Sequence, residues 1–81
     1  MEEFDLDLLY DLIAQRRRKL QIPVNKANVF FGISDYARKE ARRNEVRNGF
    51  TLEEFLIVCD KLKLEPIKLL QIAKKEKNNT D

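Results

Sequence analysis

Histidine, the commonest general base and metal ligand in proteins, is absent from the chain. The sequence has no glycine-rich loop that would hold a phosphate and no residue spacing typical of a metal site. Three acids of the N-terminal region, Asp5, Asp7 and Asp11, can share a helical face, but no nucleophile accompanies them. We therefore expect no enzymatic activity, no cofactor and no metal.

Cysteine occurs once, as Cys59, so no disulfide can form within the chain. A single cysteine is compatible with a reducing cytoplasm. No run of about 18 apolar residues is present to span a bilayer. The chain begins with the acidic stretch Met1-Glu2-Glu3, whereas a secretory signal begins with basic residues. These absences predict a cytoplasmic protein with no membrane contact.

Glycine and proline occur only twice each, which leaves few turns for an all-β protein and favours helices. A chain of 81 residues has too little interior for two cores. We expect one compact all-α domain over residues 1–75, followed by a frayed polar tail at 76–81.

Apolar spacing and helix-stop signals place three helices in the first half of the chain. The first covers residues 5–20, with Leu6, Leu9, Ile13 and Leu20 on one stripe. After Ile22-Pro23, a second covers 24–31 and ends at Gly32, with Ala27 and one of two adjacent phenylalanines facing inward. Ser34 is a candidate cap for a third helix over residues 35–46.

Two further helices are predicted in the second half, after the turn at Asn48-Gly49. Thr51 and Glu54 form a capping box, which opens a helix. Its inner stripe is predicted as Leu52, Phe55, Leu56, Cys59 and Leu62. Pro66 opens a fifth helix that is expected to bury Ile67, Leu70 and Ala73.

Charge is distributed unevenly along the chain, although its formal net value is only +2. Residues 1–15 carry acids and no base, residues 16–47 carry a large excess of Lys and Arg, and residues 48–81 are balanced. A positive block of this kind attracts a polyanion whatever the total charge is.

The basic block coincides with two short helices joined by a turn that contains Gly32, a pattern typical of a helix-turn-helix. Residues 6–73 resemble the phage-repressor/Cro (XRE-type) family of DNA-binding proteins. The likeness rests on Phe31-Gly32-Ile33-Ser34 at the turn and on the stretch from Thr51 to Leu70. It implies a compact five-helix, lambda-repressor-like domain whose third helix enters the major groove.

The resemblance and the charge pattern together give a set of candidate DNA contacts. Arg17, Asn25, Lys26 and Arg47 are expected near phosphates, and Arg17 in particular matches a helix-one position that contacts phosphate in the family. The third helix is expected to present Asp35, Tyr36, Arg38, Lys39, Arg42 and Arg43 at or beside the bases. Arg38 and Arg42, like Lys39 and Arg43, are four residues apart and form two adjacent stripes.

Plainer interpretations remain open for several of these residues. A run of charges is often only a solvated helix face. For Tyr36, packing on the second helix is favoured over stacking on a base. Positions that meet bases in the family correspond to Asp35, Tyr36 and Glu40, and the two acids repel phosphate. A protein-interaction module on the same fold, such as an adaptor or anti-repressor of a mobile element, is therefore the alternative hypothesis.

The leading prediction is a sequence-specific double-stranded DNA-binding protein, most simply a transcriptional repressor of a bacterium, plasmid or phage. One module of this size contacts few base pairs, so a homodimer on two half-sites is expected. Leu69 and Ile72 of the fifth helix are the predicted dimer surface.

Overall fold

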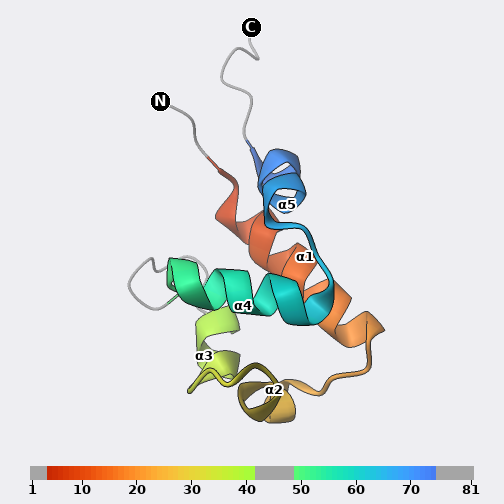
Figure 1. Ribbon diagram of the computed structural model, residues 1–81, viewed down its shortest axis with the longest axis vertical. Helices are drawn as coiled ribbons and strands as arrows, with labels where there is room; N and C mark the ends of the chain where they lie inside the picture. The colour runs from red at the N-terminus through yellow and green to blue at the C-terminus, as the bar shows by residue number, and fades with distance from the viewer. Residues whose placement is uncertain (1–3, 42–48, 75–81) are drawn as a thin grey trace, which may run out of the picture.

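The computed structural model describes residues 4–41 and 49–74. Over these residues the chain is all-α, as the composition predicts. The described part contains five helices, shown in Figure 1: α1 (Leu6–Lys19), α2 (Val24–Phe31), α3 (Tyr36–Ala41), α4 (Leu52–Leu62) and α5 (Pro66–Ala73).

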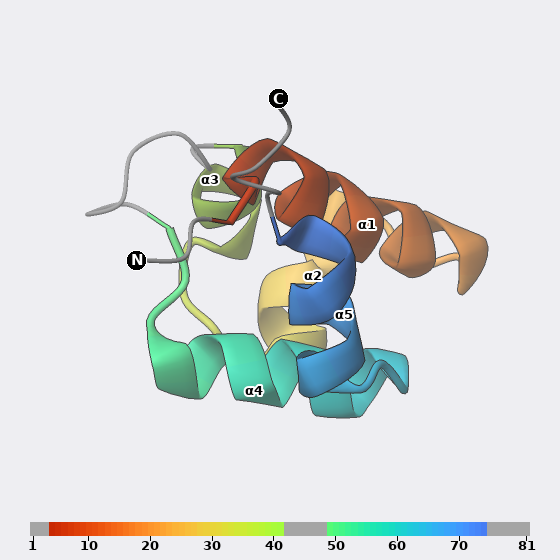
Figure 2. The same cartoon turned by 90° about the horizontal axis from the view of Figure 1, so that it is seen from above.

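The longest helix, α1, is the centre of the arrangement, and both α4 and α5 pack against it. α2 packs against α3 and α4, and the α2–α3 pair lies below α1 and α5 in Figure 1. Seen from above, α1 and α4 lie on opposite sides, with α2 and α5 between them (Figure 2). The start of α1 and the end of α5 are joined by a bridge between Phe4 and Lys74. The N–H of Asp5 also donates to the carbonyl of Ala73 at 2.7 Å.

Side-chain caps fix the starts of α1 and α4. The Asp5 carboxylate accepts from the N–H of Leu8 at 3.1 Å. At α4 the predicted capping box is present, because Thr51 Oγ1 accepts from the Glu54 N–H while the Glu54 carboxylate accepts from the Thr51 N–H. α5 begins at Pro66, also as predicted. Proline suits this position because the N–H groups of a helix's first turn have no partner within the helix.

The connection between α2 and α3 contains two residues in the left-handed region. Gly32, with φ of 71°, ends α2 at the predicted position, and its N–H donates to the carbonyl of Asn28. Asp35 has φ of 59°, so it lies outside α3, although its carbonyl accepts from the N–H of Lys39 at 3.0 Å. The predicted start of the third helix at Asp35 is thus wrong by one residue. Residues 42–46 of that predicted helix lie outside the described residues.

The core contains side chains from all five helices, but the inner face of α4 differs from the prediction. Phe55, Val58, Cys59 and Leu62 are the buried residues of α4. Leu52 and Leu56, predicted to be buried, are 75% and 46% exposed. Both sets contain the i, i+3, i+4, i+7 pattern of a helical stripe, so this spacing alone does not decide which face of α4 is buried.

The inner faces of α5 and α1 need similar corrections. On α5, Leu69 and Ala73 are buried and Leu70 is half-buried, whereas Ile67 is 66% exposed. Leu69 is therefore a core residue and is removed from the predicted dimer surface. On α1, Leu9 and Ile13 are buried as predicted, but the terminal leucines of the stripe, Leu6 and Leu20, are 36% and 40% exposed.

Candidate nucleic-acid interface

The inner faces of α2 and α3 are held together by aromatic stacking. Phe31 is the buried member of the adjacent pair, and its ring lies 4.7 Å from the ring of Tyr36 at an angle of 25°. Ile33, in the connection, is also buried. Phe30 is exposed instead, and the Lys61 Nζ lies 5.7 Å from the centre of its ring. The outer faces of α2 and α3 are thereby left to solvent.

A buried ion pair connects α3 to α1. Arg17 Nε donates to Glu40 Oε2 at 3.0 Å, and Nη2 donates to Oε1 at 3.1 Å. The remaining nitrogen, Nη1, donates to the carbonyl of Ile22 at 2.8 Å. Burial alone would lower the pKa of Arg17, but the hydrogen bond and the charge of Glu40 outweigh it and raise that pKa.

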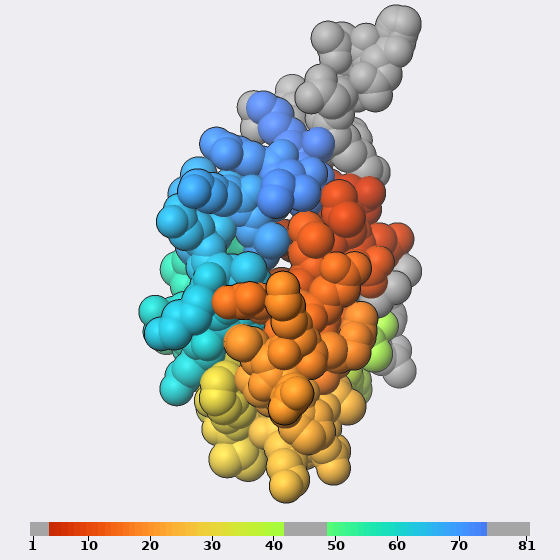
Figure 3. Space-filling view, turned by 90° about the vertical axis from the view of Figure 1, so that its right-hand side faces the viewer, coloured from red at the N-terminus to blue at the C-terminus, as the bar shows by residue number. Residues whose placement is uncertain are grey.

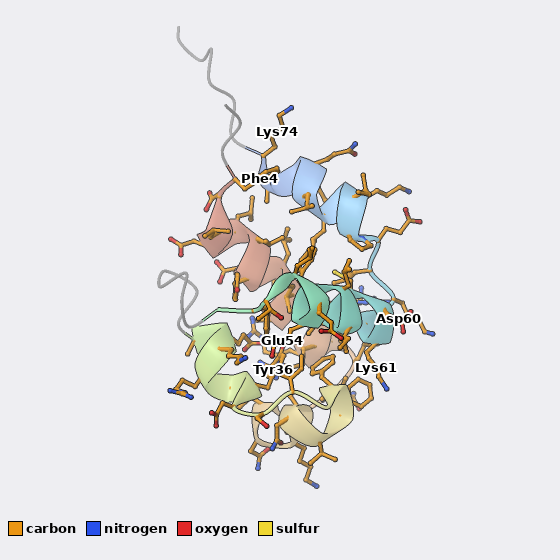
Figure 4. The ribbon with its side chains drawn as sticks, turned by 60° about the vertical axis from the view of Figure 1, so that its left-hand side comes forward. Phe4, Tyr36, Glu54, Asp60, Lys61 and Lys74 are labelled. Atoms are coloured by element: carbon orange, nitrogen blue, oxygen red, sulfur yellow. The ribbon has the colours of Figure 1, made fainter. Side chains whose placement is uncertain are left out.

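Tyr36 completes this network from the first turn of α3. Its hydroxyl donates to Glu40 Oε2 at 2.8 Å, and its ring is fully buried beneath α4 (Figure 4). Burial and then the hydrogen bond to the Glu40 carboxylate raise the pKa of the Tyr36 phenol. Two aromatic contacts extend the network, because Phe50 lies between the rings of Tyr36 and Tyr10.

Arg17 and Tyr36 therefore lie where a duplex does not reach them, and both are removed from the candidate interface. The sequence contained a signal for Arg17, because Tyr10, Ile13, Ala14 and Arg17 have the i, i+3, i+4, i+7 spacing of a buried stripe, and all four are buried. An arginine on such a stripe needs a buried acid as partner.

The outer surface of α2 carries the predicted residues Asn25 and Lys26, and both are exposed. They lie in the first turn of the helix, where Pro23 provides no side-chain cap for the N–H groups. A hollow of about 200 Å³ separates this turn from the start of α3, and it is lined by Asn25, Asn28 and Asp35 among others. Asn28 was not predicted as a site residue, although an exposed amide on this face can donate to a phosphate or a base edge.

On α3, Arg38 is exposed and pairs with Asp35, with Nη2 and Oδ2 separated by 2.6 Å. The side chains of both residues are 58% exposed, so the pair adds little stability.

Lys39 is turned toward α4 rather than outward. Its ammonium donates to both carboxylate oxygens of Glu54, at 2.9 and 2.8 Å. Desolvation would raise the pKa of Glu54, but the hydrogen bonds from Lys39 and from the Thr51 N–H lower it. The Lys39 ammonium is therefore paired within the domain. Of the residues that we predicted for the third helix, only Asp35 and Arg38 lie on the outer surface of the part that the structure describes. Arg42, Arg43 and Arg47 lie outside the described residues.

The described residues contain no group of three or more acidic, cysteine or histidine side chains placed to hold a metal. Cys59 is fully buried, as predicted, and burial raises the pKa of its thiol to about 11. Such a thiol is unreactive at neutral pH. Within residues 4–41 and 49–74, no helix has the length and apolar character needed to cross a membrane.

Comparison of the chain with models of protein families, with curated proteins and with solved structures found no match.

Proposed function

We propose that this protein binds double-stranded DNA as a small transcriptional regulator, most simply a repressor, of a bacterium, plasmid or phage. In this proposal α2 and α3 form a helix-turn-helix of the phage-repressor/Cro type, and α3 lies in the major groove. Asn25, Asn28 and Lys26 face the phosphates, and Arg38 and the following Arg42, Arg43 and Arg47 supply the remaining contacts.

The burial of Glu40 is the observation that carries the proposal. On the sequence alone, Asp35 and Glu40 oppose DNA binding, because a carboxylate on this face repels phosphate. Glu40 is neutralised by Arg17 in the interior, 8% exposed. Asp35 is paired with Arg38, and a phosphate can displace that exposed carboxylate at little cost. The main objection to a nucleic-acid interface at α3 is thereby reduced.

The charge distribution supports the same proposal. Three arginines, Arg42, Arg43 and Arg47, follow α3 directly in the sequence. The acids Asp5, Asp7 and Asp11 belong instead to the cap and the N-terminal part of α1, at the end of the domain opposite α2 (Figure 1). A duplex is attracted to one side of such a molecule and repelled from the other.

A homodimer belongs to this proposal, since two modules on two half-sites provide the affinity that one lacks. With Leu69 in the core, the exposed apolar residues of α5 are Ile67 and Ile72, at 66% and 60% exposure. We assign the dimer contact to Ile72, and measurement of the mass in solution by light scattering, with Ile72→Ser as the variant, tests it.

The DNA proposal is tested by fluorescence anisotropy with labelled duplex fragments that the protein selects from a genomic pool. Affinity is measured between about 50 and 200 mM salt, where the loss of each phosphate contact reduces the slope of log K against log salt by about 0.9. We expect the variants Lys26→Ala with Arg38→Ala, and Arg42→Ala with Arg43→Ala, each to weaken binding and to reduce the slope by about 1 to 2.

Lys68→Ala is the matched control, because this exposed lysine lies on α5, away from α2 and α3. It should leave both the affinity and the slope unchanged, and circular dichroism verifies that every variant folds. Absence of binding at low salt, or equal losses in the control and the test variants, would contradict the proposal.

A further inference from the structure

Asp35 and Arg38 form an ion pair on the outer surface at the start of α3. Arg38 Nη2 donates to Asp35 Oδ2 at 2.6 Å, and the two side chains are equally exposed, at 58% each. An exposed pair of this kind contributes little to stability, so both of its members are available to a ligand.

The backbone limits where the Asp35 carboxylate can lie. Asp35 has φ of 59°, and its carbonyl accepts from the N–H of Lys39 at 3.0 Å. Asp35 also lines the hollow between α2 and α3, together with Asn25 and Asn28. Because Arg38 is hydrogen-bonded to this carboxylate through one terminal nitrogen, the plane of its guanidinium is oriented, and other N–H donors remain for a second partner.

The pair lies at an end of the domain that a duplex can approach. In Figure 3, α2 forms the lower end of the molecule and α5 the upper end. In Figure 1, α3 lies beside α2 at the lower end, and no other helix of the described residues lies beyond them. The side chains that lie on the outer surface of α2 and α3 are therefore the first that a duplex meets at this end.

The donors and acceptors of the pair match one kind of base pair. In the major groove a guanine–cytosine pair presents two adjacent acceptors, N7 and O6 of guanine, followed by the amino donor at N4 of cytosine. A guanidinium supplies two parallel donors and a carboxylate supplies an acceptor. An adenine–thymine pair instead places its amino donor between two acceptors, so it does not match this arrangement.

We propose that Arg38 and Asp35 together read one guanine–cytosine pair in the major groove. Arg38 donates to N7 and O6 of the guanine, while Asp35 stays bound to Arg38 and accepts from N4 of the paired cytosine. A phosphate would use Arg38 alone and would have to displace the carboxylate, whereas this base pair uses both side chains. Asp35 thereby contributes to specificity rather than opposing binding, and this inference rests on the proposed binding of double-stranded DNA.

Selection from a library of duplexes with a random central segment, made with the full chain, tests the proposal. Each guanine–cytosine pair that the enriched duplexes share is then replaced in turn by adenine–thymine, and the Kd is measured by fluorescence anisotropy. We expect one such pair whose replacement weakens the wild-type chain by about tenfold, because a bidentate contact discriminates by that much. Arg38→Ala should bind the original and the replaced duplex with equal affinity.

Lys26→Ala is the matched control, since Lys26 is an exposed base of α2 that we assign to a phosphate. It should weaken both duplexes by the same factor and keep the tenfold preference, because phosphate contacts carry no base information. This difference separates loss of a positive charge from loss of base reading.

Modified bases test the two side chains separately at the identified pair. 7-Deazaguanine removes the N7 acceptor, and N4-methylcytosine replaces the N–H that faces the major groove, while both keep the base pairing. Each should weaken the wild-type chain. Asp35→Gly should respond to 7-deazaguanine and not to N4-methylcytosine, and it keeps the backbone because glycine adopts a φ of 59° freely. Circular dichroism verifies that the variants fold.

An unchanged base preference in Arg38→Ala would overturn this inference, and so would equal losses with N4-methylcytosine for the wild-type chain and Asp35→Gly. In both cases the wild-type chain still binds duplex, so the proposed function stands. Failure of the wild-type chain to bind any duplex at low salt would overturn the two together.

Discussion

Arg17 on α1 and Glu40 on α3 are 23 residues apart in sequence, yet they form a bidentate pair in the interior, with Nε and Oε2 separated by 3.0 Å. All three guanidinium nitrogens of Arg17 donate hydrogen bonds, and Glu40 accepts a further one from Tyr36. The pair links α3, the helix that we propose for the major groove, to α1.

Removal of one partner of this pair should destabilise the domain strongly. Glu40→Leu leaves the Arg17 charge buried without its acid, and such a change costs about 3–5 kcal/mol of the free energy of unfolding. The double variant Arg17→Met with Glu40→Leu removes both charges and should recover most of that loss. Urea unfolding followed by circular dichroism measures both, and a double variant no more stable than the single one would show that the pair is not coupled in this way.

Stability should also fall at alkaline pH because of Tyr36. The pKa of its phenol is raised in the folded protein above the ordinary value of 10.0, first by burial and then by Glu40. Above about pH 10 the unfolded chain loses the proton while the folded chain keeps it, so the unfolded state is favoured as pH rises. Below that pH the contribution of Tyr36 is fully present.

The difference in the free energy of unfolding between wild type and Tyr36→Phe separates this effect from that of the lysines, which titrate in the same pH range. Urea unfolding from pH 8 to 11 should show a steeper loss of stability for wild type, by at most about 1.4 kcal/mol per pH unit. Tyr10→Phe is a useful second comparison, because the pKa of Tyr10 is also raised, mainly by burial. Parallel curves for wild type and Tyr36→Phe would contradict the prediction.

The helix positions could be predicted from local signals, since capping and stop residues act over a few neighbouring residues. Thr51, Pro66 and Gly32 lie at the predicted helix ends. These residues determine backbone hydrogen bonds and φ angles within one turn, and that chemistry is contained in the local sequence. Asp35 departs from the pattern because a left-handed φ at a residue other than glycine has no strong local signal.

The inward faces and the candidate site depended on tertiary contacts and were harder to predict. Arg17 was predicted near a phosphate because it matches a helix-one position of the phage-repressor/Cro family, whereas its actual partner, Glu40, is distant in sequence. On α4, the predicted and observed stripes share Phe55, Cys59 and Leu62, and the packing of α4 against α1 and α2 decides between Leu56 and Val58 as an inner residue. Periodicity identified a helix, but the neighbouring helices selected its face.

Two leucines of α4 test that assignment of faces. Leu62 is fully buried, so Leu62→Ala should cost about 2–5 kcal/mol of the free energy of unfolding through lost burial and the cavity that remains. Leu52 is 75% exposed, so Leu52→Ala should change that free energy by less than about 0.5 kcal/mol. Urea unfolding distinguishes them, and similar losses for both variants would place Leu52 in the core instead.

Lys63, at the end of α4, offers a stabilising substitution. Its φ is 61°, in the left-handed region, and its N–H donates to the carbonyls of Asp60 and Cys59. Glycine adopts this conformation without the steric cost of a Cβ, so Lys63→Gly should raise the free energy of unfolding by about 0.5–1 kcal/mol.

Lys68→Gly is the matched control for that change. It removes the same type of side chain from the interior of α5, where glycine lowers helix stability by about 1 kcal/mol relative to alanine. Thermal unfolding should therefore show a higher Tm for Lys63→Gly and a lower one for Lys68→Gly. If both variants lost stability, the left-handed conformation at Lys63 would not be the determining factor, since loss of the lysine side chain would account for both.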